Sequence, residues 1–147
     1  MGFFAPGTYD LFLTHAWNYT DEWQGLVALL DEYIPGKWRN WSLPWHDTSI
    51  DRFSQRGREQ LEKLLRGQIA QASGIIVLPE TMDRAEGKLW LEKQLALARE
   101  FKKLVLGISP KNGTAFPTEL AAFTAVVVPR DAAQIIAALE RLQRSAS

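Results

Sequence analysis

The chain has 147 residues, of which 46% are hydrophobic and 23% charged, a composition typical of one globular domain with a single core. Seventeen basic residues balance seventeen acidic ones, so no overall charge favours nucleic acid or an anionic membrane as a partner. The absence of cysteine excludes disulfides, thiol nucleophiles and thiolate metal sites, and it fits a reducing compartment. No signal segment or membrane-spanning apolar run is recognisable, so we expect a cytoplasmic protein. The expected organisation is one domain over residues 1–147, with an ordered core from about residue 8 to 143.

The first half of the chain predicts strand, helix, strand and helix. Residues 9–14, YDLFLT, are an apolar and aromatic run typical of a buried strand. Thr20 is the predicted N-cap of a helix over residues 21–34. A short strand is predicted over residues 39–43. A long helix over residues 50–71 follows, although each of its two glycines costs about 1 kcal/mol relative to alanine.

The second half continues the alternation. Residues 73–78, SGIIVL, are a continuous β-branched run that predicts a central strand buried on both faces of a parallel sheet. A polar loop leads to an amphipathic helix over residues 88–100. Two further strands are predicted over residues 104–108 and 125–128, and a closing helix over residues 132–142. This order predicts an α/β sandwich with a mostly parallel five-stranded sheet, whose ligands bind beyond the carboxyl ends of the strands.

One polar residue interrupts the apolar stripe of the helix over residues 88–100. At about 100° per residue, Gln94 falls in the middle of that stripe, while the charged residues occupy the opposite side. An unpaired buried polar group costs about 1–3 kcal/mol, so Gln94 needs a hydrogen-bond partner from the protein or from a ligand. In the simplest interpretation Gln94 is a core amide bonded to backbone, and Trp90 on the same stripe is a core aromatic.

Several polar and aromatic residues follow the ends of the first two predicted strands. The candidate binding residues are Trp90 on the helix and, after the strands, His15, Trp17, Asn18, Trp45, His46 and Asp47. Trp17 could stack on a flat ligand ring or cap the core, and Asp47 could bind a ribose hydroxyl or cap the next helix. We expect no metal site, because neither histidine has an acidic-ligand pattern nearby. The glycine-rich loops of Rossmann dehydrogenases and P-loop NTPases are both missing.

Several motifs in the right order resemble a bacterial TIR-like domain. They are YDLFLTHAW, KWRNWSLPWHD, SGIIVLP, and WLEKQL ahead of KLVLGISP. The resemblance covers essentially the whole chain and is closest to the TIR-like subunit of Thoeris anti-phage defence systems. It implies a flavodoxin-like fold with sheet order 2-1-3-4-5 and an enzyme that cleaves the nicotinamide–ribose bond of NAD, which is its substrate and not a cofactor. In the Thoeris members, the product is a cyclic or conjugated ADP-ribose signal that activates a partner effector protein. Self-association is also common among TIR domains.

The resemblance maps a catalytic position onto the helix. TIR domains that consume NAD carry their catalytic glutamate four residues after a tryptophan, as W-x-x-x-E; Trp90 matches the tryptophan and Gln94 falls on the glutamate. A carboxylate there would meet the ribose hydroxyls and the positive charge that develops as nicotinamide leaves. Glutamine keeps the size but loses the charge. The resemblance therefore predicts an inactive chain that still binds ligand, through either an engineered substitution, which we favour because the remaining site is intact, or a natural loss of activity.

Other interpretations stay open. Glu92, roughly 160° from Gln94 on the helical wheel, and Glu80, in the loop after the third strand, are weaker candidates for the acid. The alternative function is a non-catalytic TIR-type signalling module that works by assembly, in which case Gln94 is the native residue. A third interpretation is an enzyme of the nucleoside deoxyribosyltransferase type, which would need a nucleophilic carboxylate.

Overall fold

The computed structural model describes residues 9–16, 20–42, 50–51, 53–84 and 86–146, without the side chain of residue 146. Its five strands form one parallel sheet in the order β2-β1-β3-β4-β5, which confirms both the α/β architecture and the predicted strand order. The strands are β1 (Tyr9–Leu13), β2 (Trp38–Asn40), β3 (Gly74–Val77), β4 (Leu104–Ile108) and β5 (Val126–Val128). β3, β4 and β5 are apolar stretches with β-branched residues and β1 is apolar apart from Asp10, as the sequence pattern indicates, whereas β2 is the partly polar stretch WRN.

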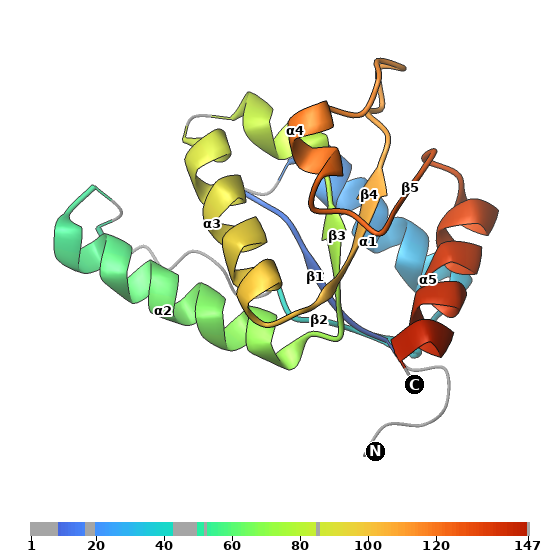
Figure 1. Cartoon of the computed structure of the whole chain (residues 1–147), viewed down its shortest axis with the longest axis horizontal. Coiled ribbons are helices and arrows are strands. Elements are labelled where there is room, and N and C mark those ends of the chain that lie inside the picture. Colours follow the sequence, from blue (N-terminus) through green and yellow to red (C-terminus); the bar gives the residue numbers. More distant parts are fainter. Residues whose placement is uncertain (1–8, 17–19, 43–49, 52, 85, 147) are drawn as a thin grey trace.

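Helices cover both faces of the sheet and give a three-layer sandwich (Figure 1). The helices are α1 (Asp21–Tyr33), α2 (Gln55–Gln71), the short 3₁₀ helix η1 (Pro79–Asp83), α3 (Gly87–Glu100), α4 (Thr118–Ala121) and α5 (Ala132–Ala146). Apolar side chains of α1 and α5 pack with one face of the sheet, and those of α2 and α3 pack with the other. None of the helices in the described ranges combines the length and apolar character needed to cross a membrane.

Several element boundaries differ from the predictions. The second helix begins at Gln55 and not at residue 50, because the hydroxyl of Ser54 caps it by accepting a hydrogen bond from the Gly57 amide at 2.9 Å. The segment after β3 forms η1 where the sequence predicted only a loop. The closing helix continues to residue 146, because the polar side chains after Leu142 are compatible with a helix on the protein surface. The second strand is also shorter than predicted and begins one residue earlier.

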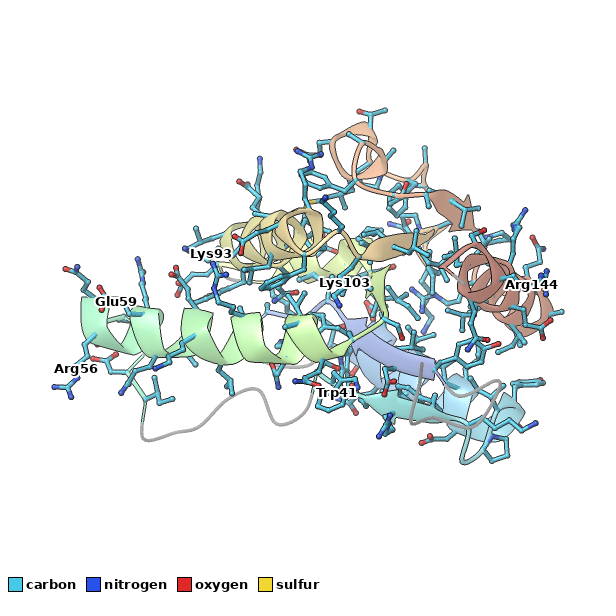
Figure 2. All side chains as sticks on the ribbon, turned by 60° about the horizontal axis from the view of Figure 1, so that its bottom comes forward. Trp41, Arg56, Glu59, Lys93, Lys103 and Arg144 are labelled. Atoms are coloured by element: carbon cyan, nitrogen blue, oxygen red, sulfur yellow. The ribbon has the colours of Figure 1, made fainter. Side chains whose placement is uncertain are left out.

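Helices α2 and α3 lie side by side, with Glu59 and Lys93 among their outward-pointing charged side chains (Figure 2). Lys93 forms an ion pair with Glu62 of α2, so the outer surfaces of the two helices are linked by charge. Below these charges, the buried residues Leu65 and Trp90 belong to the core on this face of the sheet. Surface pairs of this kind contribute little free energy, so the packing of the apolar stripes holds α3 in position.

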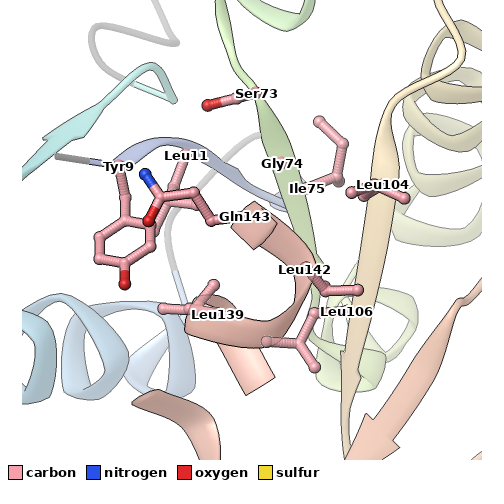
Figure 3. A pocket seen from close by; sticks show the side chains of 10 residues that line it. All are labelled: Tyr9, Leu11, Ser73, Gly74, Ile75, Leu104, Leu106, Leu139, Leu142 and Gln143. Carbon is pink, nitrogen blue, oxygen red and sulfur yellow. The ribbon is translucent and has the colours of Figure 1, made fainter. Parts of the chain in front are cut away.

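A small apolar cavity lies between the sheet and α5, near the amino ends of the strands (Figure 3). Its volume is about 70 Å³, and its walls include Leu11, Ile75 and Leu106 of the sheet and Leu139 of α5. Small-molecule sites usually enclose about 300–1,000 Å³. This cavity is therefore too small for a nucleotide, and the opposite edge of the sheet is the place to look for a ligand site.

Candidate functional site

The carboxyl ends of β1 and β3 are joined side by side, as expected for strands that flank the point where strand order reverses. The Thr14 amide donates to the Ile76 carbonyl at 3.0 Å, and the Leu78 amide donates to the Thr14 hydroxyl oxygen at 2.9 Å. The Thr14 and Thr81 hydroxyl oxygens lie 3.2 Å apart. Ligands of open α/β sheets bind in the crevice at this reversal point, so the residues above it are the first candidates for function.

Gln94 reaches this edge from α3 and binds the backbone of one residue. Its side-chain Oε1 accepts a hydrogen bond from the His15 amide at 3.1 Å, and its Nε2 donates to the His15 carbonyl at 2.6 Å. The residue is fully buried. The predicted need for a hydrogen-bond partner is confirmed, and the protein itself supplies that partner. Only a group that both donates and accepts can pair with the N–H and C=O of one residue in this way, and an ionised carboxylate cannot.

His15 and Trp90, two of the candidate binding residues, are also fully buried. The His15 ring lies 5.4 Å from the Phe12 ring, and its Nδ1 is 3.0 Å from the Ala16 carbonyl oxygen. Trp90, on the buried side of α3, belongs to the hydrophobic core on this face of the sheet, and the Lys93 ammonium lies 5.9 Å from the centre of its ring. The structure therefore brings His15 and Gln94 together, but it exposes neither the His15 ring nor the Trp90 ring to solvent. The other candidates, Trp17, Asn18, Trp45, His46 and Asp47, lie outside the described residues.

An open hollow occupies the same edge. It has a volume of about 380 Å³, in the range of small-molecule sites, and it is lined by Glu22 at the start of α1, by residues of η1 and by residues 110–117 after β4. Because these segments follow β1, β3 and β4, the hollow lies across the reversal point of the sheet. Among the described residues, no group of three or more Asp, Glu or His side chains is arranged to hold a metal ion.

Glu80 is the most buried charged residue lining this hollow, with a side chain that is 9% exposed. Its Oε2 accepts a hydrogen bond from the Lys111 amide at 2.7 Å, and its Oε1 accepts one from Arg130 Nη2 at 3.3 Å. The carboxylate thus connects the segments that follow β3, β4 and β5. From the sequence alone, Glu80 is only a weak candidate for the acid. The available signal was its place just after Pro79, which ends a central strand, but its partners lie 31 and 50 residues away.

Comparisons with known proteins place the chain in no family. No family model matches it, and no curated protein matches its sequence. Among solved structures, it is similar to a CMP N-glycosidase of Clostridium botulinum, BcmB. The TM-score of that comparison is 0.48, with 12% sequence identity over 89% of this chain and 98% of that chain.

Proposed function

We propose that this chain is a TIR-like domain that binds NAD at the carboxyl edge of its sheet, and that cleavage of the nicotinamide–ribose bond depends on a carboxylate at position 94. One observation carries the proposal. The side chain at the W-x-x-x-E position extends from α3 to the backbone of His15, so it ends at the edge and reversal point where sheets of this type bind ligands. A ligand with a cleavable glycosidic bond would meet this position once the bond to His15 opens.

The chemistry requires negative charge where nicotinamide departs. Loss of nicotinamide leaves positive charge on the anomeric carbon and its ring oxygen, and a nearby carboxylate stabilises that charge in a site from which water is excluded. Gln94 is neutral, so the chain binds NAD without cleaving it. With a carboxylate in place, the anomeric carbon is then captured by a nucleophilic atom of the same ADP-ribose or of a second small molecule, and the product is a cyclic or conjugated ADP-ribose compound that a partner effector protein detects as a signal. NAD is the substrate, and the reaction uses no further cofactor.

The test compares nicotinamide release by the unsubstituted chain, by Gln94→Glu and by Gln68→Glu. Gln68 is a second buried glutamine, on α2, and serves as the matched control for placing a carboxyl group in a buried position. We expect NAD binding by all three proteins, with nicotinamide and an ADP-ribose product only from Gln94→Glu, measured by mass spectrometry. Folded Gln94→Glu that binds NAD but releases no nicotinamide would contradict the proposal.

The second candidate function is a non-catalytic TIR-type module that acts by self-association. It is favoured by the double hydrogen bond between Gln94 and His15, because an amide whose oxygen and nitrogen both bond to the protein has a structural role and needs no ligand. In that case Gln94 is the native residue. The chain should then form oligomers without NAD in sedimentation experiments, and NAD should change neither its oligomeric state nor its melting temperature.

A further inference from the structure

We propose that the hollow lined by Glu22, η1 and residues 110–117, called the ribosyl site below, binds the ribose of a nucleoside, and that Glu80 accepts hydrogen bonds from the cis-diol of this ribose. The proposal deepens the proposed function by naming the part of the dinucleotide that this edge recognises, and it rests on that function only for the identity of NAD. The ligand class itself follows from the position, charge and shape of the site.

The position of the ribosyl site follows from strand order. β1 and β3 are neighbours in the sheet. After β1 the chain passes through α1, on one face of the sheet, to β2; it then passes through α2, on the other face, to β3. The loops after such a pair separate and leave a crevice between them. Glu22 follows β1 and Glu80 follows β3, so the site spans this crevice, and its third wall follows β4.

Glu80 is preorganised as an acceptor. Lys111 and Arg130 hold the carboxylate in one orientation at the wall of the site. An ionised carboxylate has about four acceptor positions, and these contacts use two of them. The remaining acceptor capacity belongs to a group that is already oriented and largely dehydrated. Such a group binds hydroxyl donors without the entropic cost of ordering an exposed side chain.

The charge of the lining selects hydroxyl groups over phosphates. Glu22, Glu80 and Asp83 contribute three carboxylates to the site, against the lining cation Lys111 and Arg130, which pairs with Glu80 at 3.3 Å. The remaining excess of negative charge disfavours an anionic phosphate, whereas ribose hydroxyls can donate to a carboxylate, as the 2′-hydroxyl does in dinucleotide-binding folds. The rest of the wall includes three prolines and a methionine, which offer apolar surface to the faces of a sugar or base; they are Pro79, Pro110, Pro117 and Met82.

The test is a titration of the unsubstituted chain with adenosine, followed by two-dimensional NMR. The backbone amide of Lys111 donates to Glu80 and therefore reports on that carboxylate. We expect adenosine to shift the Lys111 amide signal saturably, and 2′-deoxyadenosine, which lacks one hydroxyl of the diol, to bind about tenfold more weakly. Inorganic phosphate should not compete. Absence of a shift at Lys111, equal binding of the two nucleosides, or the same shift on addition of phosphate or magnesium chloride would overturn the proposal.

Variants separate a binding role of Glu80 from its structural role. Glu80→Gln keeps the size of the side chain but removes the charge that pairs with Arg130, so its fold is checked first by the dispersion of its NMR spectrum. Asp83→Asn changes an exposed side chain of the same wall and leaves the Arg130 contact in place. Each variant should weaken adenosine binding about tenfold. Glu119→Gln, on an exposed residue of α4, is the matched control and should bind normally. Unchanged binding in Asp83→Asn and in folded Glu80→Gln would overturn the proposal.

The two proposals fail in different ways. Adenosine binding is measured on the unsubstituted chain and requires no turnover. If Gln94→Glu releases nicotinamide while adenosine leaves the Lys111 amide unshifted, the ribosyl site is wrong and NAD cleavage stands. If adenosine binds as expected while folded Gln94→Glu releases no nicotinamide, the ribosyl site stands and NAD cleavage is wrong.

Discussion

Gln94→Glu should make the stability of this protein strongly dependent on pH. In the folded chain, the Gln94 amide donates to the His15 carbonyl at 2.6 Å and accepts from the His15 amide at 3.1 Å, in a fully buried position. A protonated carboxyl group of the same size can make both bonds. An ionised one loses the donated bond and places a negative oxygen against the carbonyl oxygen. The folded state therefore favours the protonated form and raises the pKa of the introduced carboxyl.

The loss of stability follows from the difference between the pKa of this carboxyl in the folded and in the unfolded chain. An unfolded glutamate titrates near pH 4.3, so below about pH 4 the variant should be nearly as stable as the parent chain. As the pH rises, the unfolded state ionises while the folded state resists ionisation, and stability falls by up to about 1.4 kcal/mol per pH unit until the folded-state pKa is reached. By pH 7 the loss can reach about 4 kcal/mol, and it should be at least the roughly 1–3 kcal/mol of one unpaired buried group.

Urea unfolding at several pH values between about 4 and 7 measures the effect, with tryptophan fluorescence as the signal. Gln94→Met is the matched control, since it removes both bonds to His15 and should lower stability by an amount that does not depend on pH between these values. If the difference between Gln94→Glu and the parent chain is the same at pH 4 and pH 7, the amide does not pair with His15 as described. Nicotinamide release by Gln94→Glu should accordingly be expressed per folded molecule.

Four further predictions concern the elements that frame the site and the opposite edge. Gly87→Ala would place a Cβ 1.8 Å from the Thr81 carbonyl oxygen, so it should cost about 3 kcal/mol or more in urea unfolding, and a near-normal stability would show that α3 can shift away from η1. Lys102→Gly relieves a left-handed residue (φ 56°) at the end of α3 and should raise the free energy of unfolding by about 1 kcal/mol, where a decrease would refute the strain. Gly74→Ala adds a methyl group beside the small apolar cavity at ordinary contact distance and should stabilise by about 0.5 kcal/mol, whereas a loss would indicate that the cavity wall is rigid and already filled. Burial raises the pKa of Tyr9 above 10.0, so stability should fall as the pH rises through 10, and Tyr9→Phe should flatten this fall in alkaline urea titrations; equal slopes would contradict the prediction.

Much of the fold could be predicted because its signals are local. The run that forms β3 is apolar on every residue, and a strand of that composition has to be buried on both faces. Thr20 caps α1 as predicted, with its hydroxyl accepting from the Trp23 amide at 3.0 Å. The exact strand order did not come from periodicity; it was implied by the resemblance of the motifs to TIR-like domains, and the sheet has that order.

The contacts of the candidate site could not be predicted, because they join residues that are far apart in the chain. Gln94 and His15 are separated by 79 residues, and Glu80 and Arg130 by 50. Helical periodicity established that Gln94 is buried but contains no information about which backbone lies opposite. The same pattern is equally compatible with a ligand, with a core carbonyl, or with the pair of bonds to His15 that the structure contains.

The first residue of α2 could not be predicted either, although the residues that determine it are close together in the sequence. Residues 50–54 have side chains that fit a helix, and Ser54 can either continue a helix or cap one. The Asp51 backbone approaches Gly57 so closely that a Cβ on Gly57 would lie 1.7 Å from the Asp51 carbonyl oxygen. This folded-back turn, with the hydroxyl of Ser54 bonded to Gly57, sets the first residue of the helix.

The sequence by itself therefore determined which stretches are strands and helices, which faces are buried and that Gln94 requires a partner, because these properties depend on the spacing of side chains along one element. Only the tertiary structure decided that the partner is the backbone of His15, and that Glu80, Lys111 and Arg130 meet at one edge. Those contacts depend on the order in which the strands pair. Strand order brings together loops whose sequences contain no information about which other loop they will contact.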